Sequence, residues 1–185
     1  MNTIAIYDHL ERIANLLRTD TRRTGTARGL HPVHMEALHY LCNCNRYSNT
    51  PAAVSDYLGL TKGTVSQTLA VLENAGFIEK RPDAKDRRVV HLQVTERGAA
   101  LVAEAIPPKI LQAAMAQTPE AEQARVLAEL ARVLRALQQA NQLRTFGVCK
   151  TCRHHQIETE DTHRCGLTGE ILQGIDIDQL CREHE

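Results

Sequence analysis

The chain has no run of about 18 apolar residues, which is the shortest run expected of a membrane-spanning helix. Its N-terminus also lacks the cationic start and the uninterrupted apolar block of a secretion signal, because Asp8, Glu11 and Arg12 interrupt the apolar residues. These two absences predict a cytoplasmic protein with no membrane partner. In that compartment the six cysteines are expected to be thiols or metal ligands before they are disulfides.

Net charge is also missing, since 22 Lys and Arg balance 22 Asp and Glu. The charges are nevertheless unevenly distributed. Residues 61–98 hold seven Lys or Arg against five Asp or Glu, whereas residues 149–185 hold four against eight. An acidic C-terminal segment therefore masks a basic middle segment, and local positive charge is what contact with phosphate groups requires.

The middle segment predicts a helix with both of its ends defined. Val65, Leu69 and Leu72 recur at the i, i+4 and i+7 positions of one helical face, so this face is expected to be buried. Thr61 is a predicted N-cap and Gly76 a predicted C-terminal stop. With 185 residues and 43% hydrophobic content, the chain is long enough for one core with an appended module.

Short elements are predicted on both sides of this helix. Thr50 followed by proline predicts the start of a helix over residues 51–58, and Gly59 turns that helix into the next one. Residues 77–80 and 88–94 predict two strands joined by a charged turn. Two short helices with a tight turn, followed by a hairpin, are typical of a winged helix-turn-helix.

The N-terminal third predicts two further helices. An apolar stripe at helical spacing predicts a helix over residues 3–18: Ile6, Leu10, Ile13 and Leu17. Residues 19–29 are polar, with two glycines, and are expected to form a loop. A second helix is predicted from Pro32 to about Cys44.

Beyond the hairpin, Thr95 is a predicted helix N-cap, and Pro107-Pro108 must end or kink the helix that it starts. A long helix is predicted from Pro119 to about Leu143. It carries an apolar row at near-heptad spacing: Val126, Leu130, Val133, Leu134 and Leu137. Together with the first helix, this row is a candidate dimerisation surface, although packing within one chain is the alternative.

Over residues 3–143 the chain resembles the MarR family of winged-helix repressors. The resemblance is carried by the run AVSDYLGLTKGTVSQTLAVLENAGFIEKRPDAKDRRVVHLQVTERGAAL, which begins at Ala53. Within it, D-x-x-D-R-R at Asp83–Arg88 and L-x-V-T-x-x-G at Leu92–Gly98 match the family's wing and the start of its next helix. The resemblance implies a homodimer that places one recognition helix per subunit in successive major grooves of double-stranded DNA.

On this basis a set of residues is expected to contact DNA: Lys62, Thr64, Ser66, Gln67, Thr68, Arg81, Lys85, Asp86, Arg87 and Arg88. Glutamine bonds well to adenine, and lysine to guanine or phosphate. Arg87 and Arg88 are candidates for insertion into the minor groove. The family motif implies that Asp86 orients one of these arginines and leaves open which one.

Cysteine and histidine also occur near the second helix. Cys42 and Cys44 point in different directions on a helix, so they are interpreted as small buried hydrophobes, with a redox-sensing role as the alternative. His31, His34 and His39 lack the i, i+4 spacing of a helical metal site and are interpreted as packing or surface residues.

The last 40 residues contain a candidate metal site with the pattern C-x2-C-x12-C-x15-C, formed by Cys149, Cys152, Cys165 and Cys181. Four such thiols match a tetrahedral zinc site, and a metal would stabilise a segment with few apolar residues. His184 is an alternative fourth ligand. A [4Fe-4S] cluster is also compatible with this spacing, and free thiols or reversible disulfides remain a third possibility.

The sequence therefore predicts a mainly α fold with a small β-hairpin wing. Its expected parts are an N-terminal dimerisation helix and loop (1–30), a winged helix-turn-helix (31–98), C-terminal dimerisation helices (99–146) and a cysteine-rich metal-binding module (147–185). The expected function is a homodimeric transcriptional regulator, a repressor by preference, released by a small-molecule effector, metal or redox signal. The alternatives are an iron-sulfur sensor of the same kind and, remotely, a metal-dependent enzyme.

Overall fold

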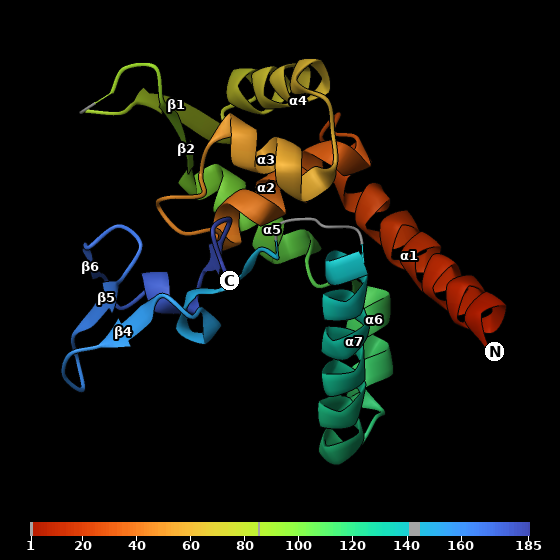
Figure 1. Cartoon of the computed structure of the whole chain (residues 1–185). Helices are drawn as coiled ribbons and strands as arrows, with labels where there is room; N and C mark the ends of the chain where they lie inside the picture. Colours follow the sequence, from red (N-terminus) through yellow and green to blue (C-terminus); the bar gives the residue numbers. More distant parts are fainter. Residues whose placement is uncertain (1, 85, 141–144) are drawn as a thin grey trace.

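The computed structural model describes residues 2–84, 86–140 and 145–185, and these fold mainly into α-helices with small antiparallel sheets (Figure 1). The helices are α1 (Thr3–Thr26), α2 (Pro32–Asn43), α3 (Pro51–Leu58), α4 (Lys62–Asn74), α5 (Glu96–Ala105), α6 (Lys109–Ala116) and α7 (Glu120–Ala140). Strands β1 (Ile78–Pro82) and β2 (Val90–Val94) pair as a hairpin after α4. None of the described helices is both long and apolar enough to cross a membrane.

Side-chain caps fix the starts of the helices around the predicted turn. The Thr50 hydroxyl accepts a hydrogen bond from the amide of Ala53, and the Thr61 hydroxyl accepts one from the amide of Thr64. Between these helices Gly59 has a φ of 64°, a left-handed conformation that glycine adopts without steric cost. The predicted helix-turn-helix over α3 and α4 is therefore confirmed.

The hydrophobic core lies where α2, α3, α4 and the base of the hairpin meet. Its largest fully buried side chains include Tyr40 and Met35 from α2, Leu69 from α4, and Phe77 and Leu92 from the hairpin region. The predicted inner row of α4 is confirmed, since each of its three apolar residues is at most 2% exposed. This core holds α4 firmly against the rest of the domain and leaves its other side free.

The base of the hairpin is joined closely to α5. The backbone amide and the hydroxyl of Thr95 both donate to the carbonyl of Phe77, at 3.0 Å and 3.2 Å. A Cβ atom at Gly98 would lie 2.3 Å from the same carbonyl oxygen, so only glycine fits there. The guanidinium of Arg97 lies over the Phe77 ring, 4.7 Å from its centroid.

Helix α1 is longer than predicted. The loop expected over residues 19–29 is wrong for most of its length, because α1 continues to Thr26. Gly25 is buried, and a Cβ atom there would lie 3.2 Å from the Met35 side chain, so the end of α1 packs closely against α2. Gly29, with a φ of 71°, then turns the chain toward α2.

The helices after the winged helix-turn-helix follow the prolines. Pro107-Pro108 separates α5 from α6, and α7 begins directly after Pro119, as predicted. The structure describes α7 as far as Ala140, so its predicted end at Leu143 lies outside the described residues. In Figure 1, α1 and the pair α6 and α7 project away from the edge that carries α4 and the hairpin.

The C-terminal residues form a module of short elements. Strands β4 (His155–Ile157), β5 (His163–Cys165) and β6 (Ile171–Leu172) make an antiparallel sheet, and β3 (Gly147–Val148) pairs with β7 (Leu180–Cys181). Two 3₁₀ turns, Cys149–Thr151 and Asp176–Asp178, complete it. The predicted module at residues 147–185 thus has its own secondary structure.

This module is docked on the winged-helix domain. Phe146, which precedes it, is 8% exposed and packs edge-on against the rings of Tyr40 and Tyr57, at centroid distances of 5.9 Å and 5.1 Å. Leu180 forms a β-bridge with Cys44 at the end of α2. The C-terminal segment therefore shares the core of the domain that precedes it.

Candidate DNA-contacting surface and cysteine pocket

The outer side of α4 carries exposed polar side chains. Lys62, Thr64, Ser66 and Gln67 are all exposed, as predicted for the recognition helix. They lie on the first two turns, beyond the capping hydroxyl of Thr61. Polar groups at these positions provide both donors and acceptors for base edges and phosphates.

Thr68 departs from the prediction. Its side chain is 3% exposed and belongs to the buried side of α4, so we exclude it from the candidate DNA-contacting residues. The reason is geometric, because Thr68 follows Val65 by three positions and precedes Leu72 by four. It therefore lies on the same helical face as the apolar row.

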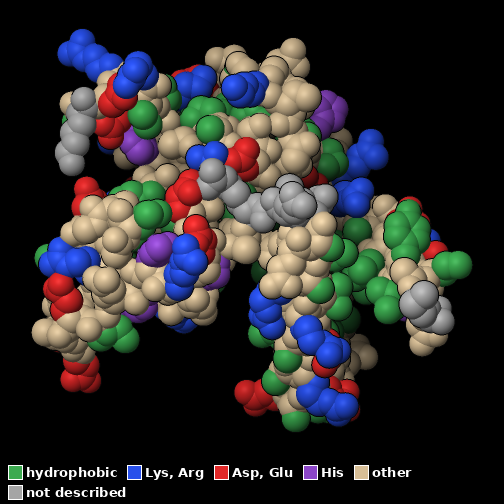
Figure 2. Space-filling view, in the orientation of Figure 1, with side chains coloured by type: hydrophobic (Ala, Val, Ile, Leu, Met, Phe, Trp, Pro, Cys, Tyr) green, Lys and Arg blue, Asp and Glu red, His purple; other side chains and the backbone are tan. Residues whose placement is uncertain are grey.

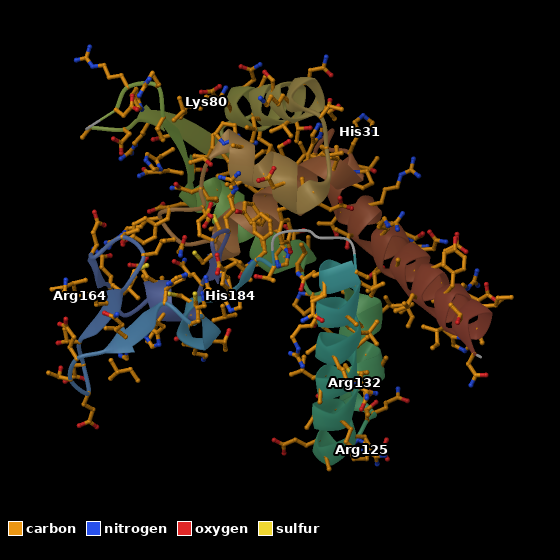
Figure 3. The ribbon with its side chains drawn as sticks, viewed as in Figure 1. His31, Lys80, Arg125, Arg132, Arg164 and His184 are labelled. Carbon is orange, nitrogen blue, oxygen red and sulfur yellow. The ribbon has the colours of Figure 1, made fainter. Side chains whose placement is uncertain are left out.

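A cleft adjoins this polar side of the helix. It is lined by the start of α3, by Lys62, Val65, Ser66 and Leu69 of α4, and by Lys80 of β1. Lys80 lies beside α4 (Figure 3), where its ammonium group pairs with Glu73 at 2.6 Å. Lys80 was not among the predicted DNA-contacting residues, because only the pairing of the hairpin strands brings it beside α4.

At the tip of the hairpin, Asp86 holds Arg88. The guanidinium of Arg88 donates to both carboxylate oxygens of Asp86, with its Nε at 3.0 Å from Oδ1 and a terminal nitrogen at 2.8 Å from Oδ2. These hydrogen bonds lower the pKa of Asp86 below its ordinary value, so the carboxylate stays ionised. The structure thus answers a question left open by the sequence, since Arg88 is the arginine that Asp86 orients.

The other basic residues predicted for the hairpin have different surroundings. Arg87 is exposed, and Arg81 pairs with Glu79 on its own strand at 3.0 Å. Lys85 lies outside the described residues. Basic side chains gather at the end of the hairpin in Figure 2, although the carboxylates of the same strands lie close to them.

A hydrogen-bond network around His91 connects the hairpin with the loop between α2 and α3, and it was not predicted. One ring nitrogen of His91, Nδ1, lies 2.6 Å from the side-chain oxygen of Asn49, and the other, Nε2, lies 3.1 Å from Asp83. The amide of Leu92 donates to the carbonyl of Asn49 at 2.7 Å. The loop between α2 and α3 therefore contacts strand β2, a link between residues 42 or more positions apart that no local motif signals.

Four cysteines line one small pocket in the C-terminal module. Three separate segments supply them: Cys149 and Cys152 share one turn, and Cys165 and Cys181 come from two others. His154, His155 and, from the winged-helix domain, Tyr47 also line this pocket. All four are free thiols. Burial and the neighbouring thiols raise the pKa of Cys149 to about 11, so ionisation of this thiol is disfavoured unless a cation is present.

The pocket gathers the thiols without arranging them as ligands. Within the described part of the chain, no group of three or more His, Cys, Asp or Glu side chains stands in an arrangement that could hold a metal ion. Residues that line one space do not by themselves define a coordination geometry. The metal prediction therefore stays a prediction.

His184, the alternative fourth ligand, does not line the cysteine pocket. Its Nδ1 lies 2.9 Å from the Thr145 hydroxyl, and its Nε2 lies 2.9 Å from the Thr151 hydroxyl. The ring packs on Gly147, where a Cβ atom would lie 2.5 Å from it. Figure 3 labels His184, and its role as a ligand stays a prediction.

The cysteines and histidines of α2 behave as packing residues. Cys44 is 5% exposed, and its burial raises the pKa of its thiol to about 12, so it stays protonated. Cys42 is half-buried. Nδ1 of His34 accepts a hydrogen bond from the amide of His31 and thereby caps α2, which agrees with a structural role for both histidines.

The projecting helices carry apolar side chains on their surface. None of the described residues of α7 is buried, and the predicted row includes Leu130 at 49%, Leu134 at 56% and Leu137 at 57% exposure. Ile6 and Ile13 of α1 are also about half exposed, at 53% and 48%. We call α1 one arm of the molecule and the pair α6 and α7 the other. Figure 2 shows hydrophobic side chains along both arms, a pattern typical of surfaces that another chain covers.

A helix-turn-helix with an exposed polar second helix, followed by a hairpin that presents an oriented arginine, defines the class of winged-helix DNA-binding domains. The comparisons with known proteins agree with this class. Residues 28–89, which extend from just before α2 to the returning side of the hairpin, match the model of the MarR family. The matched residues include the helix-turn-helix and most of the hairpin, where the sequence motifs of the predicted family resemblance also lie.

Individual relatives are regulators of transcription. "Transcriptional repressor MprA" of Escherichia coli strain K12 is 34% identical over 83 residues, which are 45% of this chain and 47% of that protein. The chain spans about half the length of the curated relatives it matches. These relatives are named as a transcriptional repressor and an HTH-type transcriptional regulator.

Two solved structures with the same fold are complexes with DNA. Streptococcus pneumoniae FabT in complex with DNA has a TM-score of 0.60 and 25% identity, and the match covers 75% of this chain and 99% of that one. The S. aureus MepR-DNA complex has a TM-score of 0.56 and 26% identity, over 71% of this chain and 98% of that one. The matched chains are thus covered almost completely.

Proposed function

We propose that this protein is a sequence-specific, DNA-binding transcriptional regulator that acts as a homodimeric repressor. The observation that carries this proposal is the placement of two features on one edge of the molecule (Figure 1). The exposed side of α4 offers Lys62, Ser66 and Gln67 to a major groove, and the hairpin offers Arg88 to the neighbouring minor groove.

The geometry of Arg88 supports its part in this reading. Its side chain is 90% exposed, yet Asp86 holds the guanidinium in a two-point hydrogen bond. Such a pair is worth little to stability at the surface. Its value lies in orientation, because a guanidinium that is already positioned loses less conformational freedom when it enters a groove.

The second copy is proposed from the arms. None of the described residues of α7 is buried, so its own chain supplies little of the packing that stabilises a helix of this length. The exposed leucines of α7 and the isoleucines of α1 give both arms a surface that a second copy of this chain can cover. A two-fold dimer then presents two recognition helices, which suits an operator with two half-sites.

Release from DNA is proposed to follow from a change in the spacing of the two recognition helices. A signal that shifts the arms relative to each other moves the half-sites of the protein while those of the operator stay fixed. A small molecule bound between arm and winged helix is one such signal, and a metal or redox change in the C-terminal module is another.

Footprinting tests the proposal directly. The full chain is applied to the DNA upstream of its own gene, and a protected site with two half-sites is the expected result. Arg88→Ala should lose protection while its secondary structure is unchanged. Arg153→Ala is the matched control, since Arg153 is also an exposed arginine paired with a carboxylate but lies in the C-terminal module. Equal protection by both variants would remove the hairpin from the mechanism.

A further inference from the structure

The four cysteines of the C-terminal module are held by a backbone that already brings them together. The amide of Cys152 donates to the carbonyl of Cys149 at 3.0 Å, which closes a tight turn between the first two. Gly169 donates to the carbonyl of Cys165 at 2.7 Å and closes a second turn. Cys181 arrives from strand β7. Four thiols from three separate segments thus surround one pocket, and none forms a disulfide.

The pocket that the four thiols share is small. Its cavity volume is about 40 Å³, a few times the roughly 10–15 Å³ that a cavity needs to hold one water molecule. A single ion needs less room between the thiols than a cluster of four iron and four sulfur atoms does. Rotation of the cysteine side chains between staggered wells would let their sulfur atoms close around such an ion.

We propose that this pocket binds a single zinc ion through Cys149, Cys152, Cys165 and Cys181, and that the bound ion positions the hairpin that reads DNA. The donor set fits, because four cysteine thiolates form a closed structural zinc site with no position left open for catalysis. The second half of the proposal rests on the contacts that lead from the pocket to the hairpin, and its effect on DNA rests on the proposed function.

The first of these contacts flank Cys181. Its neighbour Leu180 accepts a hydrogen bond from the amide of Asn45 at 2.9 Å. Its other neighbour, Arg182, donates its amide to the hydroxyl of Ser48 at 2.8 Å. Asn45 and Ser48 are at most 1% exposed and belong to the loop between α2 and α3. A ligand bond to Cys181 would therefore fix both anchors of this loop at once.

A further contact reaches the pocket from the loop itself. Tyr47 lines the cysteine pocket, and its hydroxyl donates to Glu170 at 2.8 Å. Arg46 donates to the Tyr47 hydroxyl at 2.7 Å and pairs with buried Asp176 at 3.7 Å. The loop between α2 and α3 is thus bound to the module both through Asn45 and Ser48 and through Arg46 and Tyr47.

The same loop then contacts the hairpin through Asn49. The carbonyl of Asn49 accepts from the amide of Leu92 at 2.7 Å, and its side-chain oxygen lies 2.6 Å from Nδ1 of His91. His91 in turn contacts Asp83 near the hairpin tip at 3.1 Å. Hydrogen bonds from the residues beside Cys181 to Asn45 and Ser48, the backbone from Ser48 to Asn49, and hydrogen bonds from Asn49 to β2 therefore connect the pocket with the hairpin.

These contacts couple the pocket to the hairpin only if both take part in the same conformational equilibrium. Without the ion, β7 is held by a two-residue ladder and by the loop, so it is expected to open more often. Each opening releases Asn45 and Ser48, and with them Asn49. Zinc binding is therefore expected to raise the population of the state in which the hairpin is correctly placed.

The metal content of the full chain is the first test. Protein purified in the presence of zinc is expected to hold one zinc ion per chain, and Cys165→Ser is expected to lose it. Cys42→Ser is the matched control, because Cys42 is a half-buried free thiol outside the pocket. Absence of zinc from the wild type, or iron with visible absorption in its place, would overturn the assignment.

Hydrogen exchange of the Leu92 amide is the second test and does not depend on DNA. Removing zinc with a chelator should speed exchange at Leu92 and lower operator affinity by about tenfold, within the usual range of coupling between sites. Restoring zinc should reverse both, which separates coupling from irreversible unfolding. Unchanged exchange and unchanged affinity after zinc removal would overturn the coupling.

The two proposals fail in different ways. If the zinc-loaded protein binds no DNA yet Leu92 still responds to zinc, the proposed function is wrong and the coupling stands. If the protein binds DNA equally well with and without zinc, the proposed function stands and the coupling is wrong.

Discussion

Replacing Leu134 by alanine is expected to weaken the association of two copies of this chain without unfolding either. Leu134 is 56% exposed in the single chain, and burial of a whole leucine side chain contributes about 1.5–3 kcal/mol. Burial of the exposed half in a dimer is therefore worth about 1 kcal/mol. A two-fold interface contains the residue twice, so the loss is about 2 kcal/mol, or roughly a 30-fold higher dissociation constant.

Sedimentation of the full chain over a range of concentrations measures this change. Ile157→Ala is the matched control, because Ile157 is 69% exposed but lies on β4 of the C-terminal module, far from the arms in the sequence. Circular dichroism recorded at a concentration at which both variants are dimeric should be unchanged, since neither substituted side chain is buried within its own chain. A wild-type chain that stays monomeric, or a Leu134→Ala dimer as tight as the wild type, would refute the reasoning.

Three smaller predictions follow from single contacts. Lys62→Ala should weaken operator binding and reduce the slope of log affinity against log salt concentration by about one, because one phosphate contact is lost. An unchanged slope would exclude a contact between Lys62 and a phosphate. Thr50→Ala should lower the free energy of unfolding by about 1 kcal/mol, measured by urea denaturation, because the cap on the amide of Ala53 is lost. Hydrogen bonds from Arg88 lower the pKa of Asp86, so the ion pair should be fully present above the ordinary pKa of aspartate and be lost only as the pH falls through the depressed value. An NMR titration of the Asp86 carboxylate would measure this pKa, and in Arg88→Ala it should rise.

Features set by neighbouring residues were predicted well. The caps at Thr50, Thr61 and Thr95 act over three positions, so the sequence contains all that determines them, and the structure confirms each one. The burial of Thr68 was predictable in the same way, from its spacing to Val65, but the polarity of its side chain favoured the opposite assignment. Periodicity is the stronger signal in such a case, because one hydroxyl is easily accommodated at the edge of a core.

Features that depend on distant residues were missed. Within the extension of α1 to Thr26, Gly25 packs against Met35, a contact that no local pattern in residues 19–29 indicates. The same holds for the docking of the C-terminal module. Its anchors, Asn45 with Leu180 and Ser48 with Arg182, join residues more than 130 positions apart. The spacing of the four cysteines predicted that they lie together, but no pattern in the sequence indicated that their module docks on the loop between α2 and α3.

The close contact between Gly98 and the carbonyl of Phe77 has a mechanical consequence. The first turn of α5 lies directly against the base of the hairpin, since a Cβ atom at Gly98 would meet the Phe77 carbonyl oxygen at 2.3 Å, and Thr95 donates two hydrogen bonds to the same carbonyl. Interiors packed this closely shift as rigid units and do not deform gradually. Helix α5 and the hairpin base therefore form one lever, so any tilt of α5 displaces the far end of the hairpin by a larger distance than it displaces the helix itself.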